Sequence, residues 1–125
     1  MDRKINVLIV DNQRRTRKSL RALVATWPAI SAIREAANGA EALRMTEDYR
    51  PDLVLIDEHM ESMGGLEITQ RVKECCPEIG VVVLSMYSDL EPGAMASGAD
   101  AFVSKADPPE VLLRILEAVA GREKQ

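Results

Sequence analysis

Cysteine, histidine, aromatic residues and long apolar runs are all scarce in this 125-residue sequence. The two cysteines, Cys75 and Cys76, are adjacent and make a poor disulfide framework, which favours reduced thiols in a cytoplasmic protein. They lie far from any histidine cluster, so a zinc site is not expected. No apolar run approaches the roughly 20 residues that a membrane span needs. The apolar run near the N-terminus is short and ends at Asp11, which is unlike a signal peptide.

The overall charge is modest and acidic. The net charge is −4, so the molecule as a whole has no bulk attraction for nucleic acid. Apolar residues make up 46% of the chain and charged residues 29%, which is typical of a globular protein rather than a disordered one. The length, without repeats or linkers, predicts one domain over residues 1–125. We expect neither direct nucleic-acid binding nor membrane binding.

Four short segments are almost entirely apolar and predict strands that are buried on both faces. Continuous Val, Ile and Leu runs of this length are typical of a parallel sheet. A fifth, weaker strand is expected at Ser31–Glu35, and its charged residues Arg34 and Glu35 favour an edge position. The four apolar segments are Ile5–Val10, Asp52–Ile56, Gly80–Leu84 and Asp100–Val103.

Helical patterns lie between these strands. Asn38 with Glu41 three residues later is a capping-box pattern. In the last helix, Asp107 is expected to cap, Pro108 to take the first helical position and Gly121 to close the helix. The alternation predicts an α/β fold, a doubly wound five-stranded parallel sheet with helices on both faces. The clearest helical segments are Gln13–Trp27, Gly39–Asp48, Gly65–Glu74 and Asp107–Ala120.

Polar residues follow the strands where the carboxyl ends of a parallel sheet meet, which is where such folds bind ligands. Oxygen ligands of this kind suit Mg²⁺. A Lys and a Ser nearby suit a phosphoryl group, and a carboxylate such as Asp57 can itself become an aspartyl phosphate. These residues are Asp11 and Asn12 after the first strand, Asp57 after the third, Ser85 after the fourth, and Ser104 and Lys105 after the fifth.

The whole chain resembles the response-regulator receiver domains of two-component signalling. The resemblance rests on "VLIVDN", "PDLVLIDEHM…GGLE", "VVVLS" and "GADAFVSK", in order and at family-like spacing. The segment "DAFVSKADPPEVLLRIL" is most similar to receivers that precede helix-turn-helix output domains in transcription regulation. The resemblance implies a flavodoxin-like strand order of 2-1-3-4-5.

The resemblance also implies a role for each site residue. Asp57 is expected to accept a phosphoryl group from a histidine kinase or phosphotransfer protein. Asp11, Asp57 and the backbone carbonyl of His59 are expected to hold Mg²⁺. Ser85 is expected to bond to the phosphoryl oxygens, and Lys105 to pair with them.

A conformational response is implied as well. Phe102 matches the aromatic switch residue that turns inward when Ser85 moves. Phosphorylation is then expected to shift an existing two-state equilibrium that controls an output protein or domain, with a homodimer left open. The chain is not expected to be an enzyme beyond self-phosphorylation from small donors and self-dephosphorylation.

Several positions depart from the family pattern. Asn12 stands where a second acid is usual, which predicts weaker Mg²⁺ binding through an amide oxygen. Glu58 or Glu61 are candidates to compensate, although strand alternation is expected to point Glu58 away from Asp57. Gly64 replaces a frequent Asp and adds backbone freedom to the loop.

The region of the fourth helix also departs from the family, because Pro92 and Gly93 oppose a helix interior. We therefore expect a short or irregular fourth helix. The basic run at residues 14–21 on the first helix is expected to be a solvated face or a docking surface for an acidic partner such as the kinase. His59 and Tyr87 flank the site and are candidates to tune dephosphorylation.

One other function remains as a rival, and two more are disfavoured by the first strand's end. A degenerate receiver would act as a phosphorylation-independent interaction module, which Asn12, Gly64 and the irregularity at Pro92 and Gly93 favour. The retained site residues argue against it, namely Asp11, Asp57, Ser85 and Lys105. An aspartate-nucleophile phosphatase usually carries Asp-x-Asp after its first strand, and "VDNQ" lacks it. A flavin site needs a Ser/Thr- or Gly-rich phosphate loop there, and "DNQRR" is not one.

Overall fold

The predicted five-stranded parallel sheet is present in the computed structural model, which describes residues 4–57 and 64–122. The strand order is β2-β1-β3-β4-β5, and each pair of neighbours is parallel, as the sequence resemblance implied. The weakest predicted strand lies at the edge, as its charges indicated. The strands are β1 (Ile5–Val10), β2 (Ile30–Ala36), β3 (Leu53–Asp57), β4 (Gly80–Ser85) and β5 (Ala101–Ser104).

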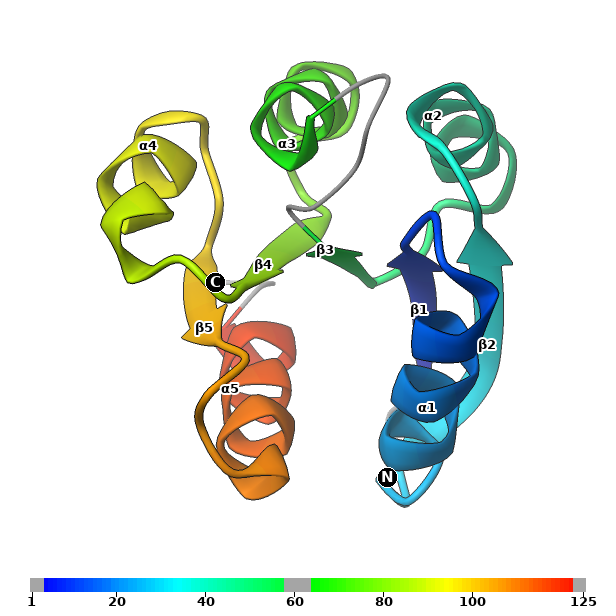
Figure 1. Ribbon diagram of the computed structural model, residues 1–125. Coiled ribbons are helices and arrows are strands. Elements are labelled where there is room, and N and C mark those ends of the chain that lie inside the picture. The colour runs from blue at the N-terminus through cyan, green and yellow to red at the C-terminus, as the bar shows by residue number, and fades with distance from the viewer. Residues whose placement is uncertain (1–3, 58–63, 123–125) are drawn as a thin grey trace.

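The helices form a layer on each face of the sheet. Helices α2, α3 and α4 cover one face, and α1 and α5 cover the other (Figure 1). A short 3₁₀ turn, η1 (Ser88–Leu90), leads into α4. The helices are α1 (Arg14–Val24), α2 (Gly39–Tyr49), α3 (Gly65–Cys75), α4 (Glu91–Ala96) and α5 (Pro109–Arg122). Within residues 4–57 and 64–122, no helix is long and apolar enough to cross a membrane.

Two hydrophobic cores explain why the central strands are almost entirely apolar. Successive side chains of a strand point to opposite faces. On β1, Val7 and Ile9 join the core under α1 and α5, whereas Leu8 and Val10 join the core under α2, α3 and α4. Both faces are covered, so neither set of alternating residues can be polar.

The boundaries of helices α1 and α5 differ from the sequence prediction. Helix α1 ends at Val24 rather than Trp27, because the backbone tightens into i→i+3 turns, with Trp27 N–H donating to Val24 O at 3.0 Å. Helix α5 begins at Pro109 rather than Asp107 and continues through Gly121. A residue before proline disfavours the helical conformation, so Pro108 stays outside the helix, and the predicted Asp107 cap and Gly121 stop are wrong.

The capping box of α2 is confirmed. The Asn38 side chain accepts a hydrogen bond from Glu41 N–H at 2.8 Å. The Glu41 carboxylate in return accepts from Ala37 N–H at 2.8 Å, one residue earlier than the usual pattern.

The fourth helix is short, as predicted. Helix α4 has six residues, and Pro92 lies in its first turn, where no N–H partner is lost. Gly93 packs closely on α3, since a Cβ there would lie 3.2 Å from Leu66 Cδ1. The proline therefore starts this helix rather than breaking it.

Lys73 ties three segments together at the amino end of the sheet. Its ammonium donates to Ile79 O at 2.8 Å, to Pro77 O at 3.1 Å and to Asp100 Oδ2 at 3.0 Å. The same Asp100 oxygen accepts from Val81 N–H. These contacts hold the loops that precede β4 and β5.

We expect Lys73→Met to lower the free energy of unfolding by about 2 to 3 kcal/mol, because hydrogen bonds to charged groups contribute about 1.5 to 3 kcal/mol. Arg71→Met is the matched control on the same helix. It removes only an exposed i,i+4 pair with Glu67 and should cost less than about 0.5 kcal/mol. Urea denaturation measures both, and equal losses would contradict this role for Lys73.

Candidate functional site at the carboxyl edge of the sheet

Asp57 and Lys105 form a partly buried ion pair. Asp57 is the last residue of β3, and Lys105 follows β5. The Lys105 ammonium lies 2.9 Å from Asp57 Oδ2, and the Asp57 side chain is only 5% exposed. β4 separates the two strands in the sheet, so only the long lysine side chain brings these groups into contact.

Asp11 is fully buried directly after β1. Its backbone N–H donates to Ala36 O at 3.0 Å, and its Oδ1 accepts from Gln13 N–H at 2.8 Å. Its other oxygen, Oδ2, is buried and has no hydrogen-bond partner within the described part of the chain. Burial, together with the neighbouring Asp57 carboxylate, raises the pKa of Asp11 to about 6, although the hydrogen bond from Gln13 N–H and the Lys105 charge act in the opposite direction.

Ser85 links the ends of β4 and β5. Its side chain is buried, its Oγ accepts from Tyr87 N–H at 3.0 Å, and its carbonyl accepts from Lys105 N–H at 2.9 Å. The hydroxyl proton remains able to donate one hydrogen bond. Ser85 is therefore held beside the lysine that contacts Asp57.

The remaining predicted residues stand as follows. Asn12 is exposed in the bend after Asp11, so the departure from a second acid lies at the surface of the site. Phe102 is partly buried against the core under α2, α3 and α4. His59, Glu58 and Glu61 lie outside the described residues, and their predicted roles stay predictions.

The donor set fits Mg²⁺. Mg²⁺ keeps several waters and needs only one or two carboxylates, and Asp11 and Asp57 provide two. The buried Asp11 Oδ2 without a donor is an oxygen that a divalent cation would satisfy. Within the described residues, no group of three or more His, Cys, Asp and Glu side chains is placed to hold a metal.

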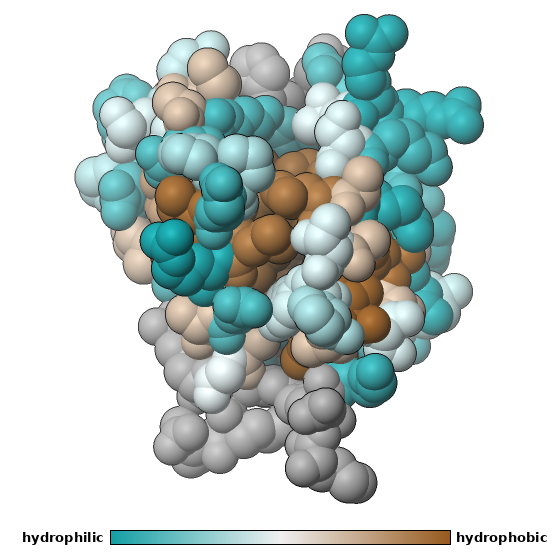
Figure 2. Space-filling model, turned by 90° about the horizontal axis from the view of Figure 1, so that it is seen from below, coloured by the Kyte–Doolittle hydropathy of each residue, from teal (hydrophilic) through white to brown (hydrophobic). Residues whose placement is uncertain are grey.

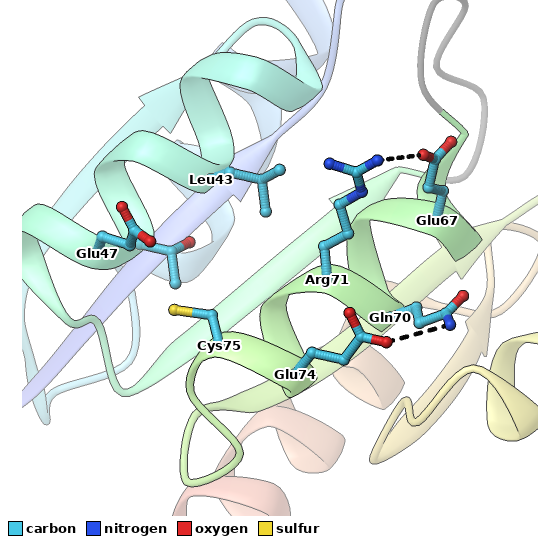
Figure 3. A pocket seen from close by; sticks show the side chains of 8 residues that line it. Leu43, Glu47, Glu67, Gln70, Arg71, Glu74 and Cys75 are labelled. Atoms are coloured by element: carbon cyan, nitrogen blue, oxygen red, sulfur yellow. Dashed lines mark hydrogen bonds and ion pairs between the residues drawn. The ribbon is translucent and has the colours of Figure 1, made fainter.

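A groove lies between α2 and α3, separate from the carboxyl edge of the sheet. The groove has a volume of about 650 Å³. Figure 3 shows its side chains pairing with one another, Arg71 with Glu67 at 3.1 Å and Gln70 with Glu74 at 3.3 Å. These are ordinary i,i+4 pairs of a solvated helix, so we base no function on the groove. Its lining residues are Leu43, Thr46, Glu47, Glu67, Gln70, Arg71, Glu74 and Cys75.

The basic run of α1 is partly neutralised within the molecule. Arg17, Lys18 and Arg21 all point to Glu35 on β2, with Nε or Nζ to oxygen distances of 3.1, 3.6 and 2.6 Å. Burial raises the pKa of Glu35, but hydrogen bonds from Arg21 and Arg17 and the charge of Lys18 outweigh it and leave the pKa lowered. Arg17 is only 15% exposed, so it belongs neither to a solvated face nor to a free docking surface.

The sequence analysis missed Arg17 and Glu35 as neighbours of the site. The Arg17 guanidinium donates to Asp11 O at 2.8 Å. A single acid in the edge strand, opposite a basic helix, was the available signal. It could not show which of the basic residues reaches the Asp11 turn.

Comparison with known proteins agrees with this geometry. The family model for the response regulator receiver domain matches residues 7–117. The chain is 36% identical to the uncharacterized transcriptional regulatory protein YhcZ of Bacillus subtilis strain 168. The 122 aligned residues cover 96% of this chain and 57% of that protein. Over 119 residues it is 32% identical to the nitrate/nitrite response regulator protein NarL of Escherichia coli strain K12, covering 94% of this chain and 55% of NarL.

A solved structure of a response regulator has the same fold as this chain. A two-component response regulator of the LuxR family from Aurantimonas sp. SI85-9A1 superposes with a TM-score of 0.89 at 28% identity, covering 96% of this chain and 88% of that one. The chain spans a little over half the length of the two curated relatives. It belongs to the response-regulator receiver family of two-component signalling.

Proposed function

We propose that this domain is a working phosphoacceptor, in which Asp57 takes a phosphoryl group from a histidine kinase or phosphotransfer protein in the cytoplasm. The observation that carries the proposal is the contact between Asp57 and Lys105 at 2.9 Å, beside the buried Asp11 carboxylate. A helix cap or a turn residue would need neither a lysine partner nor a second buried acid. The site instead combines a nucleophile with groups that stabilise charge.

The chain's own residues have distinct tasks in the transfer. The Asp57 carboxylate attacks phosphorus, so an O–P bond forms at Asp57 while the N–P bond of the donor histidine breaks. Lys105 moves its ammonium from the carboxylate to a phosphoryl oxygen, and Ser85 donates its hydroxyl proton to another. Asp11, Asp57 and the His59 carbonyl would hold Mg²⁺, with Asn12 as a weak ligand. The ion would supply positive charge for the phosphoryl oxygens.

The response would follow from the new charge. A phosphoryl group adds about −1.5 to −2 charge at neutral pH, which biases an existing two-state equilibrium. Ser85 and the partly buried Phe102 are the proposed switch pair. The output protein or domain would bind the surface near β5 and the short α4. A homodimer, if one forms, would use the same surface.

The phosphodonor would approach between α1 and α5. A groove of about 360 Å³ there is lined by apolar residues of both helices, including Leu20, Leu23 and Leu112, and reaches Lys105. Figure 2 shows this band of hydrophobic side chains between the two helices. Arg14 and Arg15 are exposed on α1 and would favour an acidic kinase surface.

Intact mass spectrometry tests the phosphoacceptor function. We expect incubation with Mg²⁺ and acetyl phosphate to add one phosphoryl group, and EDTA to prevent it. Asp57→Asn keeps the size of the side chain and should give no adduct. An adduct of equal yield on Asp57→Asn would place the acceptor elsewhere.

The alternative is a degenerate receiver that acts as an interaction module without phosphorylation. Asn12 favours it, because one formal negative charge at about 4 Å contributes roughly 4 kcal/mol to cation binding at an effective dielectric of 20, before desolvation. Failure to form the adduct at high Mg²⁺ concentration, and failure to bind a stable phosphoryl mimic, would favour this alternative.

A further inference from the structure

Arg17 is the one basic residue of the α1 cluster that reaches the Asp11 turn. Its Nη1 donates to Asp11 O at 2.8 Å, and its Nε donates to Glu35 Oε1 at 3.1 Å. Arg21 binds the same carboxylate through Glu35 Oε2 at 2.6 Å, but its other donor goes to Ile33 O at 2.7 Å. The two arginines share an acid and differ in the carbonyl they hold.

The contact completes the anchoring of Asp11. The Asp11 N–H is bound by Ala36 O, its Oδ1 by Gln13 N–H and its carbonyl by Arg17. Only Oδ2 has no partner within the described residues. The bonds to the Asp11 N–H, Oδ1 and carbonyl therefore determine the position of Oδ2, the oxygen available to a cation.

The Arg17 side chain is itself held in place. It starts from the second turn of α1 and is only 15% exposed, and Glu35 is 12% exposed on β2. The planar guanidinium can satisfy two acceptors at a fixed angle, which a lysine ammonium on a flexible stem does less well. The side chain thus connects the β1–α1 turn to the neighbouring strand.

We propose that Arg17 is a positioning residue for the Mg²⁺ site, which fixes the turn that presents Asp11 Oδ2. This inference rests on the proposed function for its metal, and it adds a residue to which the family resemblance gave no role. Residues that orient metal ligands typically change metal affinity by about 10- to 100-fold when replaced. Arg17 acts through Asp11 and does not touch the phosphoryl group.

Charge and positioning predict opposite results. Removing a positive charge near the site would by itself strengthen Mg²⁺ binding, since like charges repel. Loosening the Asp11 turn would weaken it. A weaker affinity after loss of Arg17 therefore cannot be a charge effect.

The experiment compares Arg17→Gln with Arg21→Gln, which removes the same charge and the same pairing to Glu35 without touching Asp11. We expect the Mg²⁺ dissociation constant, measured by NMR titration, to rise about tenfold in Arg17→Gln and to stay equal or fall in Arg21→Gln. Arg17→Lys, which keeps the charge, should lie between wild type and Arg17→Gln. Thermal unfolding in EDTA checks that the two glutamine variants lose similar stability.

A second readout needs no metal. The Gln13 backbone N–H donates to Asp11 Oδ1. Its hydrogen should exchange with solvent about tenfold faster in metal-free Arg17→Gln than in metal-free Arg21→Gln. Equal dissociation constants and equal Gln13 exchange in the two variants would overturn the proposal. If the wild type binds no Mg²⁺, the proposed function fails and the metal part of this inference fails with it, while Gln13 exchange still decides whether Arg17 positions the turn.

Discussion

Asp11→Asn is expected to make the metal-free domain more stable while nearly abolishing its Mg²⁺ binding. Asp11 is fully buried beside a second carboxylate, and burial together with that carboxylate raises its pKa from 3.8 to about 6. One pKa unit corresponds to about 1.4 kcal/mol, so ionised Asp11 destabilises the fold by about 2 to 3 kcal/mol at neutral pH. Asparagine removes the charge and keeps an oxygen acceptor for Gln13 N–H.

The pH dependence has a defined sign. A raised pKa means that the folded state binds the proton more tightly than the unfolded state, so wild-type stability falls as pH rises from about 4 to about 6. The variant lacks this loss. The difference in free energy of unfolding should therefore be near zero below pH 4 and reach about 2 to 3 kcal/mol above pH 6, measured by urea denaturation in EDTA.

Asp52→Asn is the control for this prediction. Asp52 precedes the opposite end of β3, where its carboxylate accepts from Asn6 N–H at 2.8 Å, so its loss should not stabilise the domain. Added Mg²⁺ should stabilise the wild type and leave Asp11→Asn unchanged. If Asp11→Asn is no more stable than the wild type at pH 7 without metal, the two carboxylates do not destabilise the fold.

Lys105→Met is expected to slow phosphorylation about a hundredfold while strengthening Mg²⁺ binding. The loss of one preorganised charge-stabilising donor typically costs about 10²- to 10³-fold in rate. Without the ammonium 2.9 Å from Asp57, the two carboxylates lose a positive charge at close range, so a cation is attracted more strongly. Phosphorylation by acetyl phosphate and Mg²⁺ titration measure the two opposite changes.

Lys18→Met is the matched control, because it removes the same charge from a lysine that is 56% exposed and only loosely paired with Glu35 at 3.6 Å. Its phosphorylation rate should stay within about twofold of wild type. A Lys105→Met variant that is phosphorylated at the wild-type rate would remove Lys105 from the site. A parallel loss of Mg²⁺ binding would indicate that the variant has lost the local fold instead.

Much of the fold was predictable because its signals are local. Nearly continuous apolar runs such as Ile5–Val10 favour strands covered on both faces, and the two cores confirm this prediction. Asn38 and Glu41 marked the start of α2 through bonds made within one turn. The double proline at 108–109 was read one residue too early, because the conformation of Pro108 depends on the proline that follows it.

The strands, their carboxyl edge and the residue types gathered there follow from the amino-acid sequence alone, because hydrophobic periodicity acts over a few residues. The sequence placed Asp11, Asp57, Ser85 and Lys105 at one edge. Which of these groups touch is a property of the tertiary structure. Lys105 reaches Asp57 across β4, and Arg17 rather than Arg21 holds the Asp11 turn. Asp11 keeps one buried oxygen without a donor among the described residues. Contacts of this kind depend on side-chain lengths and angles set by packing between distant segments, and no local pattern encodes them.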